Sequence, residues 1–181
     1  MNFVDTKFPE VKIIKPNLTR DQRGSFVELW QHHRYTDMGI PDCFVQDNFS
    51  ISRKGTIRGL HFQAPFPQGK LVTVLSGKVL DVVVDIRVGS PTFKQWMSVE
   101  LSAEDYLQLW VPPGFAHGFC VLSASAHFYY KCTERWYPEH EHVIQYNDPD
   151  IGIRWPVKSP SLSERDDTAP PLSGVLDLPE F

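Results

Sequence analysis

Short stretches of alternating residues, separated by turns that contain glycine and proline, restrict the fold of this chain more than any other feature. In the stretch 78–86, two sets of side chains point to opposite faces: Val79, Asp81, Val83 and Asp85 on one, and Leu80, Val82, Val84 and Ile86 on the other. This period of two is that of a β-strand. Strands are also predicted over 44–52, 69–75, 95–101, 107–111, 118–122 and 127–133. Many short strands at close spacing predict an all-β barrel or sandwich.

Helical patterning is sparse. The stretch 28–38 is expected to form a short helix, and 102–105 a capped turn. From Tyr146 onward the chain is rich in proline and turn residues, which predicts an irregular C-terminal segment that wraps over the barrel. A length of 181 residues fits one domain, so we expect residues 1–181 to form a single domain.

Composition and charge exclude several classes of function. The net charge of −4 does not suit a nucleic-acid-binding surface. Charged residues interrupt the apolar ones in segment 1–14, so this segment reads neither as a signal peptide nor as a membrane span. The cysteines Cys43, Cys120 and Cys132 are odd in number and lack zinc-site spacing, which favours a reducing cytosol. We expect a cytoplasmic protein without a membrane or nucleic-acid partner.

Two segments carry most of the candidate chemistry. They are Arg58-Gly59-Leu60-His61-Phe62-Gln63, with Lys70 close behind, and Pro112-Pro113-Gly114-Phe115-Ala116-His117-Gly118-Phe119. They resemble the signature segments of a cupin-type jelly-roll barrel. A metal-binding cupin would have a second His at Gln63 and a Glu near Lys70, and an amide and an ammonium are poor ligands. We therefore expect an acid/base pocket that needs no metal.

Each polar residue of these segments has a structural and a functional interpretation. His61 lies between Leu60 and Phe62, where desolvation favours a neutral imidazole suited to act as a base; the alternative, which is the more common one for a lone histidine, is a core histidine bonded to backbone. Lys70 is either a surface charge or an inward ammonium that stabilises an oxyanion. His117 is either structural or a ligand contact, and nothing local decides between the two.

Two further sites depend on tertiary structure. Tyr129 and Tyr130 are adjacent, so only one can face inward from a strand, as a packing residue or as a proton donor. Asp166 and Asp167 lie in a charged run that is ordinarily solvated. Folding could bring one of them to His61, where a carboxylate would orient the imidazole and raise its basicity.

Further motifs occur in order along nearly the whole chain. They include Asp21-Gln22-Arg23-Gly24-Ser25-Phe26, Phe44-Val45-Gln46-Asp47-Asn48, Gln68-Gly69-Lys70-Leu71-Val72, Tyr130-Lys131-Cys132-Thr133, Asn147-Asp148-Pro149 and Leu162-Ser163-Glu164-Arg165-Asp166. Together with the two segments above, they resemble the dTDP-4-dehydrorhamnose 3,5-epimerase family.

The resemblance implies a metal-free, cofactor-independent jelly roll that forms a homodimer and acts on a dTDP-4-keto-6-deoxyhexose. The reaction would convert dTDP-4-dehydro-6-deoxy-D-glucose to dTDP-4-dehydro-L-rhamnose, inverting C3 and C5 through an enolate, in dTDP-L-rhamnose synthesis for polysaccharide. By position, His61 resembles the base, Asp166 its dyad partner, Tyr130 the acid and Lys70 the enolate-stabilising group. The positions that resemble the family's substrate contacts are Arg23, Phe26, Glu28, Gln46, Asn48, Arg58, Lys70, His117, Glu141 and Arg165.

One position departs from the family pattern. After Glu134 the family commonly has two aromatic residues, and this chain has Arg135 at the first of them. An epimerase that acts at C3 or C5 alone is therefore an alternative. A metal-dependent cupin enzyme is another, which Gln63 and Lys70 disfavour. A noncatalytic sugar-nucleotide-binding module is a third, which would not need a base, an acid and an enolate stabiliser together.

Overall fold

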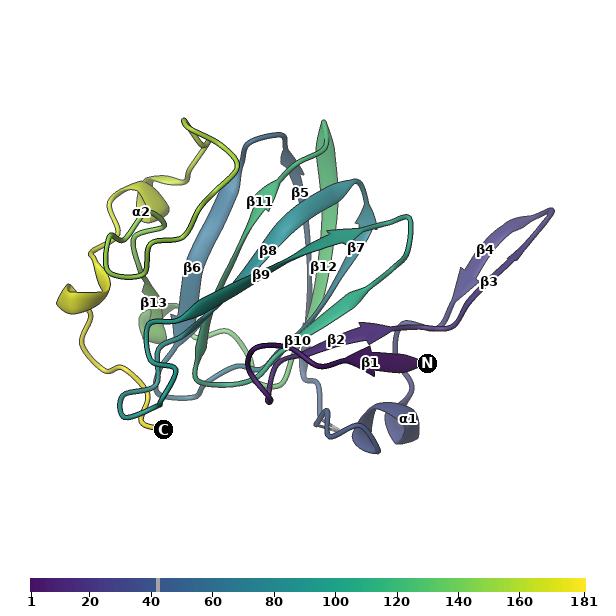
Figure 1. The fold of residues 1–181 in the computed structure, drawn as a ribbon, viewed down its shortest axis with the longest axis horizontal. Helices are drawn as coiled ribbons and strands as arrows, with labels where there is room; N and C mark the ends of the chain where they lie inside the picture. The colour runs from purple at the N-terminus through teal and green to yellow at the C-terminus, as the bar shows by residue number, and fades with distance from the viewer. Residues whose placement is uncertain (42) are drawn as a thin grey trace.

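Two antiparallel sheets face each other in the computed structural model, which describes residues 1–41 and 43–181 (Figure 1). The six-stranded sheet has the order β1 (Asn2–Val4), β2 (Lys12–Lys15), β10 (Gln108–Val111), β7 (Lys70–Ser76), β12 (Ser125–Cys132) and β5 (Gln46–Arg53). The five-stranded sheet has the order β13 (Glu141–Val143), β6 (Ile57–Gln63), β11 (Phe115–Val121), β8 (Lys78–Asp85) and β9 (Trp96–Ser102). The predicted cupin-type jelly roll is confirmed.

The alternation predicted for segment 78–86 is confirmed in β8. Val79 and Val83 pack in the core between the two sheets, where Val72 and Phe128 of the other sheet meet them. The even positions of the same strand pack outward in a second cluster. Both faces of β8 are therefore covered by protein.

The second cluster is covered by the C-terminal part of the chain. Ile144, Ile151 and Leu172 are buried against the outer face of the five-stranded sheet, and the yellow-green segments of Figure 1 lie along this side. The helix η1 (Pro138–His140) and the strand β13 precede this part. Within residues 144–181, the regular elements are the short helices α2 (Glu164–Asp167) and η2 (Leu172–Gly174). The predicted irregular wrap is confirmed, and it has a function in the fold because it buries the sheet.

The predicted helix over 28–38 is shorter than expected. The helix α1 spans His32–Thr36, and the side chain of Gln31 caps it by accepting a hydrogen bond from the Arg34 amide. Its Tyr35 is buried on the outer face of the six-stranded sheet with Leu71 and Trp110. The capped turn at 102–105 is confirmed, because Ser102 Oγ accepts from the amide of Glu104 at 3.3 Å.

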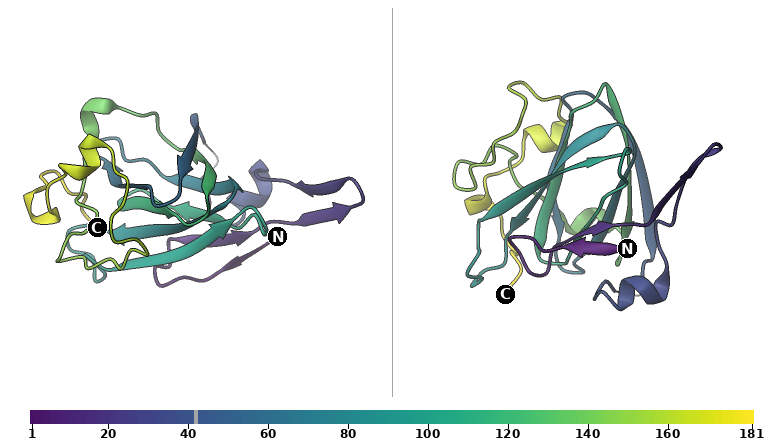
Figure 2. Two further views of the ribbon diagram at one scale, coloured as in Figure 1. Left: turned by 90° about the horizontal axis from the view of Figure 1, so that it is seen from above. Right: turned by 45° about the vertical axis from the view of Figure 1, so that its right-hand side comes forward.

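A two-stranded hairpin projects from the body of the molecule (Figures 1 and 2). It consists of β3 (Leu18–Asp21) and β4 (Gly24–Val27), which pair with each other and belong to neither large sheet. Phe26 on β4 is 74% exposed. An isolated two-stranded hairpin is marginally stable in water, so this element is expected to pack against something else. In the described part of the chain, no helix is long and apolar enough to cross a membrane.

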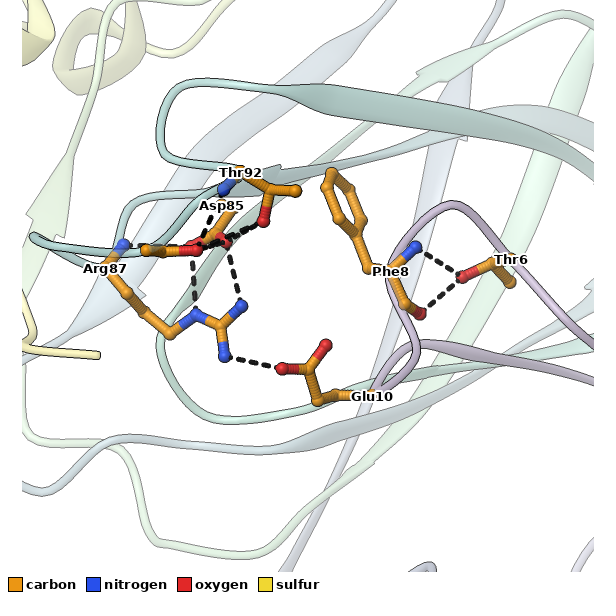
Figure 3. A network of polar contacts seen from close by, with 7 residues as sticks. Thr6, Phe8, Glu10, Asp85, Arg87 and Thr92 are labelled. Carbon is orange, nitrogen blue, oxygen red and sulfur yellow. Dashed lines mark hydrogen bonds and ion pairs between the residues drawn. The ribbon is translucent and has the colours of Figure 1, made fainter.

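A buried polar network closes the end of the barrel near the β8–β9 connection (Figure 3). Asp85 accepts hydrogen bonds from the Arg87 guanidinium at 2.8 and 2.9 Å, and from Ser90 Oγ and Thr92 Oγ1 at 2.6 Å each. Arg87 also pairs with Glu10, which ties the N-terminal loop to this turn. Burial raises the pKa of Asp85, but these hydrogen bonds outweigh it and lower the pKa to about 2.

Candidate active site

A cavity of about 340 Å³ opens between the two sheets. It is lined by Gln46, Asn48, Phe49, Ser50, Arg58, His61, Gln68, Lys70, His117, Phe119, Phe128, Tyr130, Trp136 and Glu141. The period of two explains much of this set, because alternate residues of one strand face the same side. On β5 these are Gln46, Asn48 and Ser50. The strands that bury the core at one end of the barrel thus line the cavity with polar residues at the other.

Regular alternation would not place Arg58 and His61 on one wall, because they are three residues apart on β6. The register between β6 and β11 shifts here: His117 pairs with His61, but Phe119 pairs with Arg58. This bulge turns both polar side chains to the cavity. Gly59 sits at the bulge with a φ of 127°, and a Cβ on it would lie 2.6 Å from the Cα of Gly118. Only glycine suits this position.

His61 and Asp166 form a hydrogen-bonded pair. His61 Nε2 lies 2.6 Å from Asp166 Oδ1, and the Asp166 side chain is almost wholly buried behind the ring. Burial raises the pKa of Asp166, but the hydrogen bond and the charge of His61 outweigh it and lower the pKa below its ordinary value. An ionised carboxylate can only accept, so Nε2–H donates the hydrogen bond to Asp166 and the ring presents the lone pair of Nδ1 to the cavity.

The helix α2 positions Asp166 for this contact. Ser163 caps the helix by accepting from the Asp166 amide at 3.1 Å. The parallel bridge between Thr56 and Ser161 brings this part of the chain alongside the start of β6. The predicted encounter of Asp166 with His61 therefore takes place across 105 positions of sequence.

Lys70 points inward, so the structure places it in the cavity rather than at the surface. It is the first residue of β7 and is 9% exposed. Burial lowers the pKa of its ammonium, while the charges of Glu141 and Asp81 oppose that shift. Lys70 thus offers the cavity a desolvated ammonium that can donate hydrogen bonds, with negatively charged groups nearby.

Tyr130 is the inward residue of the adjacent tyrosine pair. It lines the cavity, whereas Tyr129 points outward and donates to Asp47 Oδ2 at 3.0 Å. Burial, with the nearby Cys132 and Glu141, raises the pKa of Tyr130 to about 12, so the phenol keeps its proton at neutral pH. Tyr130 belongs to β12 of the six-stranded sheet and His61 to β6 of the five-stranded sheet. They face the cavity from opposite sides.

His117 also lines the cavity and is bonded to Asp81 at 2.8 Å. Asp81 is fully buried on β8, and its Oδ2 has no hydrogen-bond partner within the described residues. Burial raises the pKa of Asp81, against the opposing effects of His117 and Lys70. Sequence reasoning did not connect Asp81 with His117. The signal was present, because the alternation placed an acid on the same face as Val79 and Val83.

Glu141 and Trp136 form one rim of the cavity. The indole Nε1 of Trp136 donates to Glu141 Oε2 at 3.0 Å, and Glu141 Oε1 lies 3.9 Å from His61 Nδ1. Arg165 donates to Glu141 from behind and does not line the cavity. Arg135, at the position that departs from the family pattern, also lies outside the lining, because its guanidinium stacks 4.3 Å from the ring of Tyr137. The aromatic residue at the rim is the next one, Trp136.

Three of the predicted substrate contacts do not line this cavity. Arg23 and Phe26 belong to the projecting hairpin, and Glu28, just after it, pairs with Arg34 at 2.9 Å. The other predicted contacts line the cavity, except Arg165, which reaches its rim through Glu141.

The positions that match metal ligands in cupins differ in where they point. Lys70 lines the cavity, but Gln63 does not, because its amide bonds the backbone of Arg135 and Tyr137. Over residues 1–41 and 43–181, no three His, Cys, Asp or Glu side chains group closely enough to hold a metal ion.

The fold and this cavity define a jelly-roll enzyme of the epimerase class. The model of the dTDP-4-dehydrorhamnose 3,5-epimerase family matches residues 5–174. The chain belongs to this family.

Individual relatives agree. The dTDP-4-dehydrorhamnose 3,5-epimerase of Pseudomonas aeruginosa is 50% identical over 87% of this chain and 88% of its own length. The enzyme of that name from Neisseria gonorrhoeae is 49% identical over 92% of this chain, which spans about half of that relative, 51%. A crystal structure of dTDP-6-deoxy-D-glucose-3,5-epimerase from Legionella pneumophila, in complex with dTDP-4-keto-L-rhamnose, superposes with a TM-score of 0.97. It shares 52% identity, covering 99% of this chain and 98% of that one.

Proposed function

We propose that this protein is a dTDP-4-dehydrorhamnose 3,5-epimerase, which converts dTDP-4-dehydro-6-deoxy-D-glucose to dTDP-4-dehydro-L-rhamnose. The observation that carries the proposal is the arrangement of His61 and Tyr130 on opposite walls of one cavity, which the buried Lys70 also lines. The cavity thus holds a base, an acid and a cation. Inversion at a carbon requires that a proton leave from one face and return to the other. This arrangement meets that requirement.

The chemistry starts from the 4-keto group of the sugar, which acidifies the C–H bonds at C3 and C5. His61 Nδ1 takes the proton, and the electron pair of the C–H bond becomes that of an enolate. The ring then carries a positive charge, which Asp166, at 2.6 Å from Nε2, stabilises. The Lys70 ammonium stabilises the negative charge that develops on the C4 oxygen.

Protonation on the opposite face completes the inversion. Tyr130 donates its phenol proton to the carbon, the enolate returns to the ketone, and a tyrosinate remains. His61 loses its proton to water and Tyr130 regains one before the second carbon reacts. His61 is 27% exposed at its side chain, which permits this exchange with solvent.

The substrate-binding residues divide by position. Gln46, Asn48, Arg58, His117 and Glu141 would contact the substrate from within the cavity. Arg58 and Arg165 suit the diphosphate, because a guanidinium can donate two parallel hydrogen bonds to phosphate oxygens. With Trp136 rather than Arg135 at the rim, the departure from the family pattern gives no reason to restrict the reaction to one carbon.

The protein would act as a homodimer in the cytoplasm. The strand β5 ends the six-stranded sheet, lines the cavity, and exposes Phe49 and Ile51 at 54% and 59%. A hairpin docked along this edge from a second copy would bring Arg23 and Phe26 near the cavity. The hairpin would gain the packing that it lacks in one chain, and each cavity would be completed by its partner.

Mixing two variants tests the dimer. His61→Ala keeps the hairpin, and the double variant Arg23→Ala/Phe26→Ala keeps the catalytic cavity. Each is expected to be nearly inactive alone, and co-expression should restore turnover through mixed dimers in which one cavity has both parts. A fully active monomer by light scattering would contradict this arrangement.

Deuterium uptake tests the reaction. The substrate is incubated with the protein in heavy water, and deuterium is followed by NMR at C3 and C5. Label at both carbons with formation of the L-sugar is expected. Label at C3 or C5 alone would mean a single-site epimerase, and no label would end the proposal.

A further inference from the structure

The indole of Trp136 forms part of the cavity rim, but it stands on a segment without strand or helix, between β12 and η1. Such a segment is free to move unless side chains hold it. Trp136 is 49% exposed, so packing alone does not fix it. Its place at the rim must therefore be set by polar contacts.

Gln63 makes such contacts to the residues on both sides of Trp136. Its side chain is 5% exposed at the end of β6. Nε2 donates to the carbonyl of Arg135 at 3.1 Å and to that of Phe66 at 2.5 Å, while Oε1 accepts from the amide of Tyr137 at 2.9 Å. One side chain thus bonds the residue before Trp136 and the residue after it.

No other side chain of similar size could replace the amide. The task requires two donors for two carbonyls and an acceptor for an N–H, which an amide provides. A histidine offers one donor and one acceptor when neutral, and a carboxylate offers acceptors alone. Gln63 stands where a metal-binding cupin would carry a metal ligand. In this chain its side chain holds the segment 135–137 instead.

Two further hydrogen bonds hold Trp136 directly. The Trp136 amide donates to Gln46 Oε1 at 2.8 Å, and its indole donates to Glu141 Oε2 at 3.0 Å. On the far side, Phe66 stacks on Tyr137 with ring centroids 4.8 Å apart. Residues 66 and 137 are both bonded to Gln63, so the same amide aligns this stack.

We propose that Gln63 is a positioning residue that holds Trp136 against the bound nucleotide sugar, and so sets substrate affinity without taking part in proton transfer. This inference rests on the proposed function for the identity of the substrate. The side-chain bonds of Gln63 go to residues 66, 135 and 137, which lie outside the strands β6, β7 and β12 that carry His61, Lys70 and Tyr130. Loss of the anchor should therefore weaken binding of substrate and transition state alike, which raises KM and leaves kcat.

The test uses Gln63→Met, which keeps the length of the side chain and removes the three hydrogen bonds. The matched control is Gln108→Met. Gln108 is 1% exposed and also makes three hydrogen bonds, to Leu29 O, Thr73 Oγ1 and the Tyr35 hydroxyl, but on β10. Both variants should lose stability. Gln63→Met should raise KM about tenfold with kcat changed less than about threefold, and Gln108→Met should change neither.

Fluorescence gives a readout that does not need the reaction. Acrylamide should quench Trp136 more in Gln63→Met than in the parent, and this difference should vanish when both proteins also carry Trp136→Phe. If the parent shows no turnover but the quenching difference persists, the proposed function fails and the anchor stands. Equal quenching in Gln63→Met and the parent, or a fall in kcat without a rise in KM, would overturn the inference. Circular dichroism verifies that each variant is folded. Gln63→Glu is a second variant with the same expected effects, because a carboxylate cannot donate the two hydrogen bonds to the carbonyls.

Discussion

Replacing Asp85 with Asn should make the stability of this protein less dependent on acid pH. Asp85 is fully buried and accepts hydrogen bonds from Arg87, Ser90 and Thr92 (Figure 3). A depression of its pKa from 3.8 to about 2 corresponds to roughly 2 kcal/mol of folding free energy. Asp85→Asn should therefore lose about 2 kcal/mol at pH 7, or about 4–8 °C in Tm for a chain of this length.

The pH dependence follows from the direction of the shift. The folded state holds the proton of Asp85 less tightly than the unfolded state, so the stabilisation is complete above about pH 5 and disappears as pH falls through about 2. About half should remain at pH 3. The difference in stability between the parent and Asp85→Asn should therefore shrink by about half between pH 7 and pH 3.

Urea unfolding at fixed protein concentration, from pH 7 to pH 3, measures this difference. Asp150→Asn serves as the control, because Asp150 pairs with Lys94 at 2.7 Å on the surface, where an ion pair contributes little. A loss in Asp85→Asn that equals the control at pH 7, or one that stays constant down to pH 3, would refute the reasoning.

The catalytic cavity gives two further predictions. His61→Ala should abolish proton exchange at the sugar and keep dTDP binding within about threefold by calorimetry, because the base acts on the hexose; undiminished exchange would remove His61 from the mechanism. Lys70→Ala should lower kcat by about 10²–10³, the loss of one oxyanion donor, in a steady-state assay. An increase in KM alone would make Lys70 a binding residue.

The strands of the barrel could be predicted because their alternation is a local property. The pattern of 78–86 survives in β8 since both of its faces are buried. The N-terminal strands β1 to β4 were not predicted. All four are short, and β1, β3 and β4 are mostly exposed, so they lack the apolar alternation that marks a buried strand. In β2 the apolar residues Ile13 and Ile14 are adjacent and not alternating.

The site could be predicted only in part. Lys70 and Tyr130 lie on strands that the alternation predicts. The strand β6, which carries His61, is not among the predicted ranges, and the bulge at Gly59 that turns Arg58 inward has no signal in hydrophobicity. The approach of Asp166 to His61 depends on how the C-terminal segment packs. The anchoring bonds of Gln63 likewise join parts of the chain 72 and 74 positions apart. Contacts of this kind follow from the folded structure and not from spacing.

The most direct test of the central claim uses substrate deuterated at C3 and the variant Tyr130→Phe in ordinary water. His61 should still remove the deuteron and exchange it with solvent, so NMR should show loss of label at C3, while the configuration stays unchanged because no acid serves the opposite face. Inversion at the parent rate, or complete retention of the label, would contradict the assignment of base and acid to opposite walls of the cavity.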